Sequence, residues 1–231
     1  MQGGNPMTLY DQITEKHGKP KPILFNTEMV RAILDGQKTQ TRRPIKAPGN
    51  EYHYEKLLCD WPLSCKPEII EDELHWELQT AVDDSGTYTE KLLYQPGDIL
   101  YVRETFCPNY YDDGRPAYRA NYTAKVKDVV PEPKWKPSIH MPKELARIFL
   151  KITDVRVERL QKIAPEDFVA EGNKCCKDCL DHGGCALPEV CAYLPEAMKK
   201  LWDPIYKEKG YGWDEDPWVW VIEFEVSEIE K

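Results

Sequence analysis

Lys38, Thr41 and Arg43 form the stretch of this chain whose residue types and spacing best suit chemistry. They follow Gly36, where an apolar-periodic helix is expected to stop, because glycine readily adopts the left-handed conformation that ends helices. The stretch is too polar for a core and is rich in hydrogen-bond donors. For Lys38 to act as a base near neutral pH, its pKa must fall about 3 units below ~10.4, and burial in an apolar pocket can lower it that far.

Glu171 is the carboxylate most suited to join this stretch. A short helix is predicted over residues 164–172, with Pro165 near its start and Gly172 just past its end. Glu171 falls in the last turn, where the helix dipole disfavours a negative charge, so its placement predicts a cationic partner. If the partner is Lys38, the glutamate raises the lysine pKa and opposes burial. Glu171 is therefore better suited to orient water or a leaving amine.

Thr39, Thr41 and Arg43 alternate along the segment after the turn, so they share one face if that segment is a strand. Lys38 and Thr41 are an odd number of residues apart and cannot share a face of a flat strand. They can meet if Lys38 still lies in the turn after Gly36. Thr39 and Arg43 are candidate substrate-binding residues on this basis.

Arg103 and Glu104 end the apolar run at residues 99–103, which predicts a buried strand. Two interpretations stay open for this polar pair. It either faces a pocket, which makes both residues candidate substrate-binding groups, or forms an ordinary ion pair at a strand end. Residues 135–142 mix aromatic, basic and imidazole side chains, and predict either a surface that stacks a base or a proline-rich packing turn.

The pattern of elements predicts an α+β protein. Residues 1–21 are polar and are expected to form an irregular lead-in. Residues 22–231 are expected to form one domain, a small mixed β-barrel with short packed helices. The predicted strands are 23–25, 74–82, 87–94, 99–103, 146–160 and 218–226, of which the second and third form a hairpin, and the predicted helices are 27–34, 164–172 and 195–206.

The charge balance narrows the class of partner. The 231-residue chain has a net charge of −9 and a pI of about 5.2. A protein that holds many phosphates of a duplex needs a basic face, and the pI of such domains is typically above ~9. The acidic balance therefore predicts no DNA duplex as partner. We also expect no membrane partner, because no apolar run approaches the ~20 residues of a membrane span. The N-terminus has no apolar signal segment, which predicts a cytoplasmic protein. The acidic charge balance favours a small ligand of little charge.

A cysteine-rich segment offers metal-ligand spacing. Its five cysteines are Cys175, Cys176, Cys179, Cys185 and Cys191. Such a segment predicts a structural zinc site, since it has little apolar material to hold it. The wider gap between the last two cysteines departs from the usual spacing, so a segment without metal stays open as the alternative. Catalysis itself is expected to need no cofactor, because the cluster offers mainly thiolates and no open coordination position.

Gly36-x-Lys38-x-x-Thr41-x-Arg43 resembles the motif of the ASCH domain, a PUA-like small β-barrel found in bacterial and phage proteins. The extended form, with its Trp-rich last strand, is similar to phage-type members. Relative to the smallest members, insertions are expected at about 50–93 and at about 174–192. Three further blocks resemble the family in the same order: residues 96–102, 167–172 and 220–224.

The resemblance implies an amidohydrolase that removes the acyl group from N4-acetylcytidine-type substrates, with its lysine, threonine and glutamate mapped onto Lys38, Thr41 and Glu171. In one version, Lys38 takes the proton of Thr41, whose hydroxyl attacks the acyl carbon, and Glu171 passes a proton to the cytosine amine. In the other version, Lys38 and Glu171 activate water and Thr41 only forms hydrogen bonds. Arg43 stabilises the oxyanion or holds the base in both.

Two other classes of function remain. Other ASCH members are linked to RNA, which implies an RNA or modified-nucleotide binding module without catalysis. Lys38, Arg42, Arg43 and Lys46 would then contact phosphates, and an aromatic side chain would stack a base. A phage accessory protein, whose barrel is a scaffold for contacts with a host protein, is the third interpretation.

Overall fold

The computed structural model describes residues 7–45, 94–122, 132–173 and 194–229, together with the backbone of strands at 66–70, 73–78 and 88–91. Its α-helices are α1 (Leu9–His17), α2 (Thr27–Leu34), α4 (Pro165–Ala170) and α6 (Leu194–Tyr206). Its strands are β1 (Lys21–Leu24), β2 (Gln40–Pro44), β3 (Lys66–Ile70), β4 (Glu73–Leu78), β5 (Tyr88–Lys91), β6 (Ile99–Arg103), β7 (Phe106–Cys107), β8 (Ala117–Tyr118), β9 (Ile148–Arg159) and β10 (Trp218–Ile229). Short 3-10 turns lie at Ser138–His140, Lys143–Leu145, Leu160–Lys162 and Lys207–Lys209.

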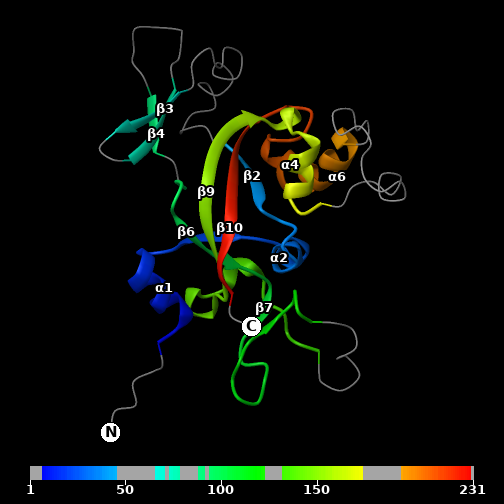
Figure 1. The fold of residues 1–231 in the computed structure, drawn as a ribbon. Helices are drawn as coiled ribbons and strands as arrows, with labels where there is room; N and C mark the ends of the chain where they lie inside the picture. Colours follow the sequence, from blue (N-terminus) through cyan, green and yellow to red (C-terminus); the bar gives the residue numbers. More distant parts are fainter. Residues whose placement is uncertain are drawn as a thin grey trace.

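A five-stranded sheet in the order β1-β6-β9-β10-β2 forms the centre of the molecule (Figure 1). β1 runs parallel to β6, and the other pairs in this sheet are antiparallel. β9 and β10, with 12 residues each, form its spine. Apolar side chains of the sheet, among them Leu150, Ile152 and Phe224, meet Val30 and Ile33 of α2 in one core cluster. The expected α+β class is confirmed.

The N-terminal lead-in is not irregular as expected, because it contains helix α1. Thr8 and Asp11 form a capping box that satisfies backbone donors at the start of this helix. Tyr10 and Ile13 lie three residues apart, share one helix face, and are buried in a cluster with Phe149 of β9. The capping pair and the apolar spacing are both local sequence patterns that predict a helix here, so the expectation of an irregular segment is wrong.

The sheet curls until its two edge strands approach each other. Arg43 on β2 donates a hydrogen bond from Nη2 to the carbonyl oxygen of Leu24 on β1, at 3.0 Å. In the described part of the chain, no backbone ladder joins β1 to β2, so this side chain spans the open side of the barrel. The turn before β2 is fixed by backbone bonds of Thr39, which donates to Ala170 and accepts from Phe224, both at 2.8 Å.

Two further segments span the ranges where insertions are expected, and the insertions themselves stay a prediction. β3, β4 and β5 form a three-stranded antiparallel sheet, in which the pairing of β4 with β5 confirms the predicted hairpin and β3 is an additional strand (Figure 1). The cysteine-rich segment at about 174–192 lies outside the described residues. α6 follows it and agrees with the predicted helix at 195–206. None of the helices in the described ranges is long and apolar enough to cross a membrane.

Gly172 sets how closely the end of α4 approaches α2 and the turn before β2. Its φ is +83°, in the left-handed region that favours glycine. A Cβ atom at this position would lie 2.7 Å from Cβ of Ala32 and 2.9 Å from Cβ of Lys38. The glycine predicted as a helix stop therefore also provides the space in which Lys38 and α4 meet.

We expect Gly172→Ala to lower the free energy of unfolding by about 2–5 kcal/mol, the sum of left-handed strain and overpacking. Gly114→Ala is the matched control, because Gly114 has the same φ of +83° and nothing within 4 Å of a Cβ atom. The control should show only the strain. Urea unfolding of both variants measures the difference, and equal losses would contradict the close approach described above.

Candidate active site

Lys38 lies at the centre of the predicted site and is fully buried. α2 ends at Leu34, and Gly36, at a φ of +70°, redirects the chain so that Lys38 forms a backbone bridge with Glu171. The Lys38 Nζ donates to the carbonyl oxygen of Gln40 at 2.7 Å. It also donates to the carbonyl oxygen and Oε2 of Glu171, at 2.8 and 2.9 Å. These three acceptors match the three N–H donors of an ammonium group.

Two opposing effects act on Lys38, as expected if Glu171 is its partner. Burial lowers the pKa of Lys38 below its ordinary value, while the charge and hydrogen bond of Glu171 oppose that shift. The ring of Phe25, whose centroid lies 5.6 Å from Nζ, is part of the apolar surroundings. A cationic partner was expected for Glu171 without being identified, and Lys38 is one such partner in the structure.

Arg42, which the sequence reasoning left out of the catalytic set, is the second buried cation of the site. It is 2% exposed, and carboxylates of Glu158 on β9 and of Asp167 and Glu171 at α4 surround it. Its Nη1 lies 3.1 Å from Oε1 of Glu171, and its Nη2 lies 2.8 Å from Oδ2 of Asp167. Its Nε lies 3.0 Å from Oε1 of Glu158. Glu171 therefore links both buried cations.

The spacing in α4 was the signal that could have revealed this cluster. Asp167 and Glu171 are four residues apart, so their side chains lie on the same face of the helix. Gln40 and Arg42 are two residues apart on β2, so both side chains lie on the strand face that meets α4. The Gln40 side chain accepts from Arg42 at 2.9 Å and donates to Asp167 at 3.1 Å and Glu223 at 3.2 Å. Glu171, the one carboxylate that the sequence predicts for the site, is therefore part of a cluster of polar side chains between α4 and β2.

Thr41 and Arg43 lie together, but they do not contact Lys38 through a hydrogen bond among the described residues. Thr41 is 1% exposed, and its Oγ1 accepts from Nη1 of Arg43 at 3.0 Å. The Arg43 guanidinium also lies over the Phe25 ring, 5.4 Å from its centroid. Thr39 has an exposed side chain and contributes its backbone groups to the turn.

Arg103 and Glu104 lie elsewhere than the site for which they were candidates. The Arg103 side chain donates to the carbonyl oxygens of Ile139 and Met141. Glu104 is buried in an ion pair with Arg147, at 2.8 Å. The two residues do not pair with each other because neighbouring side chains at a strand end point to opposite faces.

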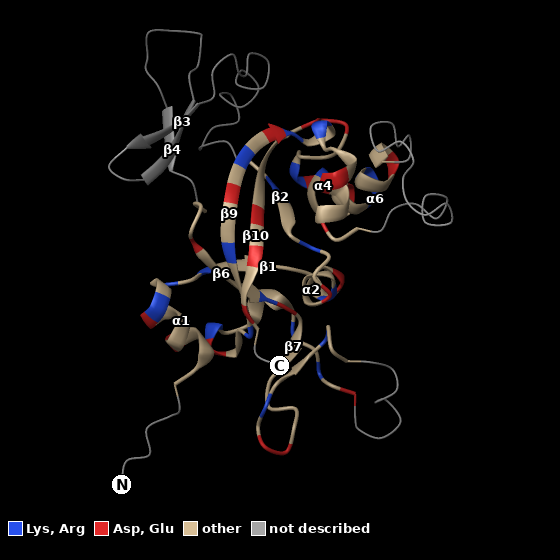
Figure 2. Ribbon diagram, viewed as in Figure 1, with Lys and Arg blue, Asp and Glu red and all other residues tan. Residues whose placement is uncertain are grey.

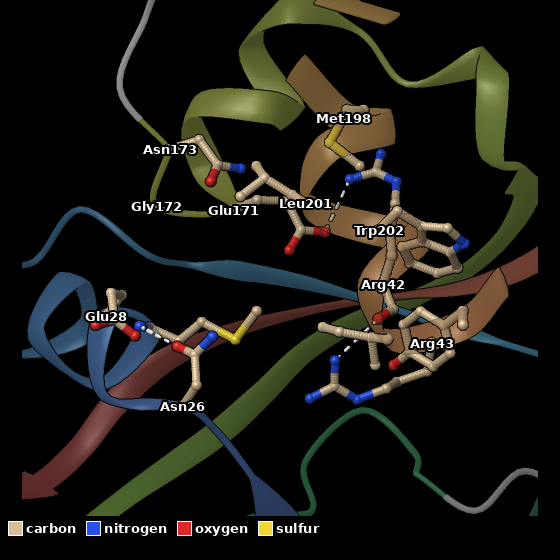
Figure 3. A pocket seen from close by; sticks show the side chains of 13 residues that line it. Asn26, Glu28, Arg42, Arg43, Glu171, Gly172, Asn173, Met198, Leu201 and Trp202 are labelled. Carbon is tan, nitrogen blue, oxygen red and sulfur yellow. Dashed lines mark hydrogen bonds and ion pairs between the residues drawn. The ribbon is translucent and has the colours of Figure 1, made fainter. Parts of the chain in front are cut away.

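A cavity of about 140 Å³ lies beside these groups (Figure 3). A cavity of ~150 Å³ holds one benzene-sized ring, so this one fits a ring of similar size. Arg42, Arg43 and Glu171 provide polar groups, and α6 provides an apolar wall. Lys38 and Thr41 do not line it. The lining residues are Asn26, Glu28, Met29, Arg42, Arg43, Glu171, Gly172, Asn173, Met198, Leu201, Trp202, Ile205 and Tyr206.

The five cysteines expected to bind zinc lie outside the described residues, so the zinc site stays a prediction. Within the described ranges, no group of three or more His, Cys, Asp or Glu side chains is arranged to hold a metal ion. The carboxylates nearest the cavity instead face guanidinium groups. Arg42 and Arg156 share Glu158 and Asp167 as partners.

Replacing Arg42 should reveal how strongly this cluster depends on its cation. We expect Arg42→Met to lower the free energy of unfolding by about 3–5 kcal/mol, because it removes a buried cation from three partly buried carboxylates. Arg115→Met is the control, since the Arg115–Asp113 pair is 73% and 54% exposed and such pairs contribute at most about 1 kcal/mol. Chemical unfolding measures both losses, and a loss below 1 kcal/mol for Arg42→Met would contradict the cluster.

The pH dependence of stability should report Asp167. Burial raises its pKa, but hydrogen bonds from Gln40 and Arg42 and the charges of Arg42 and Arg156 outweigh it and lower the pKa below 3.8. The stabilisation is therefore present above pH 3.8 and is lost as pH falls through the lowered pKa. Asp167→Asn should destabilise the protein at pH 7, and the difference from wild type should shrink as pH falls below 3.8. A difference that does not change with pH would contradict this assignment.

Comparisons with known proteins give similarity of fold and little identity. No protein-family model and no curated protein matches this chain. The chain is similar to an ASCH domain from Lactobacillus crispatus, with 16% identity and a TM-score of 0.40, over 93% of this chain and 84% of that one. It is also similar to an Enterococcus faecalis protein described by the family model DUF984, with 10% identity and a TM-score of 0.44, over 96% and 92%. The first carries the family name that the sequence motifs indicated, and at these values neither similarity transfers a site or an activity.

Proposed function

We propose that this protein hydrolyses the amide of an N4-acylated cytosine base or nucleoside. The observation that carries the proposal is the Glu171 carboxylate, which reaches the cavity wall while Lys38 and Arg42 hold its two oxygens. A carboxylate of fixed orientation thus lies beside space for one ring. Behind it lies a lysine whose pKa is lowered by burial.

In the proposed reaction, Glu171 takes a proton from water as the water oxygen attacks the acyl carbon. Arg43 stabilises the oxyanion, because its Nε–H has no acceptor among the described residues while Nη1 and Nη2 are engaged. When the C–N bond breaks, the proton on Glu171 passes to the exocyclic nitrogen, which leaves a free amine and a carboxylic acid. Lys38 is a positioning residue that orients the Glu171 carboxylate through a hydrogen bond. Because burial lowers the pKa of Lys38, its ammonium group shares a proton with that carboxylate at a lower free-energy cost.

Water, rather than Thr41, is the nucleophile in this proposal. The Thr41 hydroxyl oxygen is occupied by the hydrogen bond from Arg43. No hydrogen bond in the described part of the chain connects it to Lys38, the base that would activate it. Thr41 also does not line the cavity. These observations favour a structural role in which Thr41 holds the Arg43 guanidinium in place.

The shape of the cavity supports a small planar substrate. Its volume of about 140 Å³ accommodates one ring, so the sugar of a nucleoside would remain outside. On the side formed by α6, the rings of Trp202 and Tyr206 lie with centroids 4.3 Å apart. Leu201, which is 49% exposed, extends this apolar wall toward solvent. An acyl group can pack on the wall while the amide faces Glu171.

The alternative is a nucleotide-binding module without catalysis. Of the four basic residues expected to contact phosphates, Lys38 and Arg42 are buried in internal ion pairs. Arg43 is engaged by protein acceptors, and Lys46 lies outside the described residues. This arrangement favours a small modified nucleoside over a long RNA in either class of function.

Glu171→Gln tests the catalytic role. It should lower kcat for conversion of N4-acetylcytidine to cytidine by at least about 100-fold, because general acid–base catalysis typically contributes 10²–10⁴-fold. Thr41→Val should lose less than about tenfold, since it removes an acceptor for Arg43 and no proton-transfer group. Chromatographic or ultraviolet assays of cytidine formation measure both.

Glu166→Gln is the matched control, an exposed carboxylate on the same helix that should retain full activity. Thermal unfolding verifies that each variant is folded before its rate is compared. Folded wild-type protein that converts neither acylated base nor nucleoside would exclude the hydrolase, and equilibrium dialysis with N4-acetylcytidine would then test the binding module.

A further inference from the structure

A second cavity, of about 380 Å³, lies among the residues around β8 and the start of β9. This volume falls within the ~300–1,000 Å³ typical of small-molecule pockets. No described residue lines both this cavity and the one beside Glu171. Its lining residues are Tyr111, Arg115, Pro116, Ala117, Tyr118, Asn121, Tyr122, Glu144, Leu145, Ala146 and Arg147.

The Arg147 guanidinium is the buried polar group of this cavity. Arg147 is 5% exposed, and it donates from Nε and Nη2 to the two carboxylate oxygens of Glu104, at 2.8 and 3.1 Å. Nη2 also donates to Oδ1 of Asn121 at 3.3 Å. Nη1 has no acceptor among the described residues. Nη1 is not enclosed by the protein, so it is accessible to an acceptor in the cavity.

The charges around the cavity disfavour an anion. Glu104, which lies behind the lining, already neutralises Arg147, and Glu144 adds a carboxylate to the lining itself. Arg115, the other cation of the lining, is paired with Asp113. Burial raises the pKa of Glu104, with Arg147 opposing the shift, so a further negative charge nearby would be unfavourable. A neutral carbonyl oxygen can accept from Nη1 without that repulsion.

Aromatic rings provide the flat surfaces. The Arg147 guanidinium lies over Tyr118, with Cζ 4.1 Å from the ring centroid. Tyr111 and Tyr122 also line the cavity, and each packs edge-on against the Tyr110 ring. The Arg115 guanidinium lies over the Tyr111 ring, 5.3 Å from its centroid, and Tyr111 is 48% exposed, so the other face of this ring can take a ligand at the opening. Planar rings stack on such side chains with little dependence on their sequence or substituents.

We propose that this cavity is a second ligand site, which binds an uncharged planar heterocycle through a ring carbonyl that accepts from Nη1 of Arg147. The proposal does not depend on the hydrolase, because the two cavities share no lining residue. It assigns a role to Glu104, whose place at a strand end suggested a pocket. Glu104 holds Arg147 in position and keeps the site neutral.

Ligand-observed NMR titration with uracil tests the site, with orotate, the same ring carrying a carboxylate, as the anionic analogue. Uracil should bind, and orotate should bind at least about tenfold more weakly because of the like charges. Tyr111→Ala should weaken uracil binding about fivefold by removing a stacking surface. Glu144→Gln should reduce the discrimination against orotate. Both positions are exposed, so the fold should tolerate these changes.

Leu201→Trp, which obstructs the cavity beside Glu171, serves as the control for location. Uracil binding that survives this change and weakens in Tyr111→Ala supports the second site. The proposal is overturned if uracil does not bind, if orotate binds as tightly as uracil, or if Leu201→Trp abolishes uracil binding while Tyr111→Ala leaves it intact. None of these results bears on turnover of an acylated cytosine, which is measured separately.

Discussion

Burial of Lys38 and Arg42 beside a shared carboxylate is the constraint on which the site depends. Each buried ion costs several kcal/mol in lost hydration, and that cost is offset only by good geometry and further hydrogen bonds. Glu171 pairs with both cations, at 2.9 and 3.1 Å. Because Lys38 and Arg42 are on or next to β2, α4 must end against that strand. The position of the helix is therefore set by charge as well as by apolar contact.

This constraint accounts for the local features around α4. A carboxylate in the last turn of a helix is disfavoured by the dipole, and the two cations compensate for it. Gly172 allows the close approach that the ion pairs require. Phe168 on α4 and Trp202 on α6 belong to one apolar cluster, so α6 is carried to the same end of the sheet. The first cavity is the space left between this helix pair, α2 and β2 (Figure 3).

The two cavities differ in the charged groups that surround them. Figure 2 shows basic and acidic residues interspersed along β9, and acidic residues along β10 and on α4. Around Arg42, protein acceptors surround the guanidinium and leave Glu171 as the group that faces the cavity. Around Arg147, Glu104 occupies one edge of the guanidinium and Nη1 remains for a ligand. Arg42, whose guanidinium is surrounded by protein acceptors, thus orients Glu171. Arg147, which keeps one donor nitrogen without a protein acceptor among the described residues, is the group proposed to bind a ligand.

Elements with local signals could be predicted from the amino-acid sequence. Gly36 ends α2 as predicted, the helix before Gly172 is present, and the dipole argument anticipated a cation beside Glu171. The helix in the lead-in was missed although its capping pair was legible. Two contacts follow from the three-dimensional fold alone: Arg42, 125 residues from Asp167, enters the site, and Glu104 pairs with Arg147 outside it. Local patterns extend over one helical turn or one strand, whereas these contacts depend on the order of strands in the sheet, which spacing along the chain does not encode.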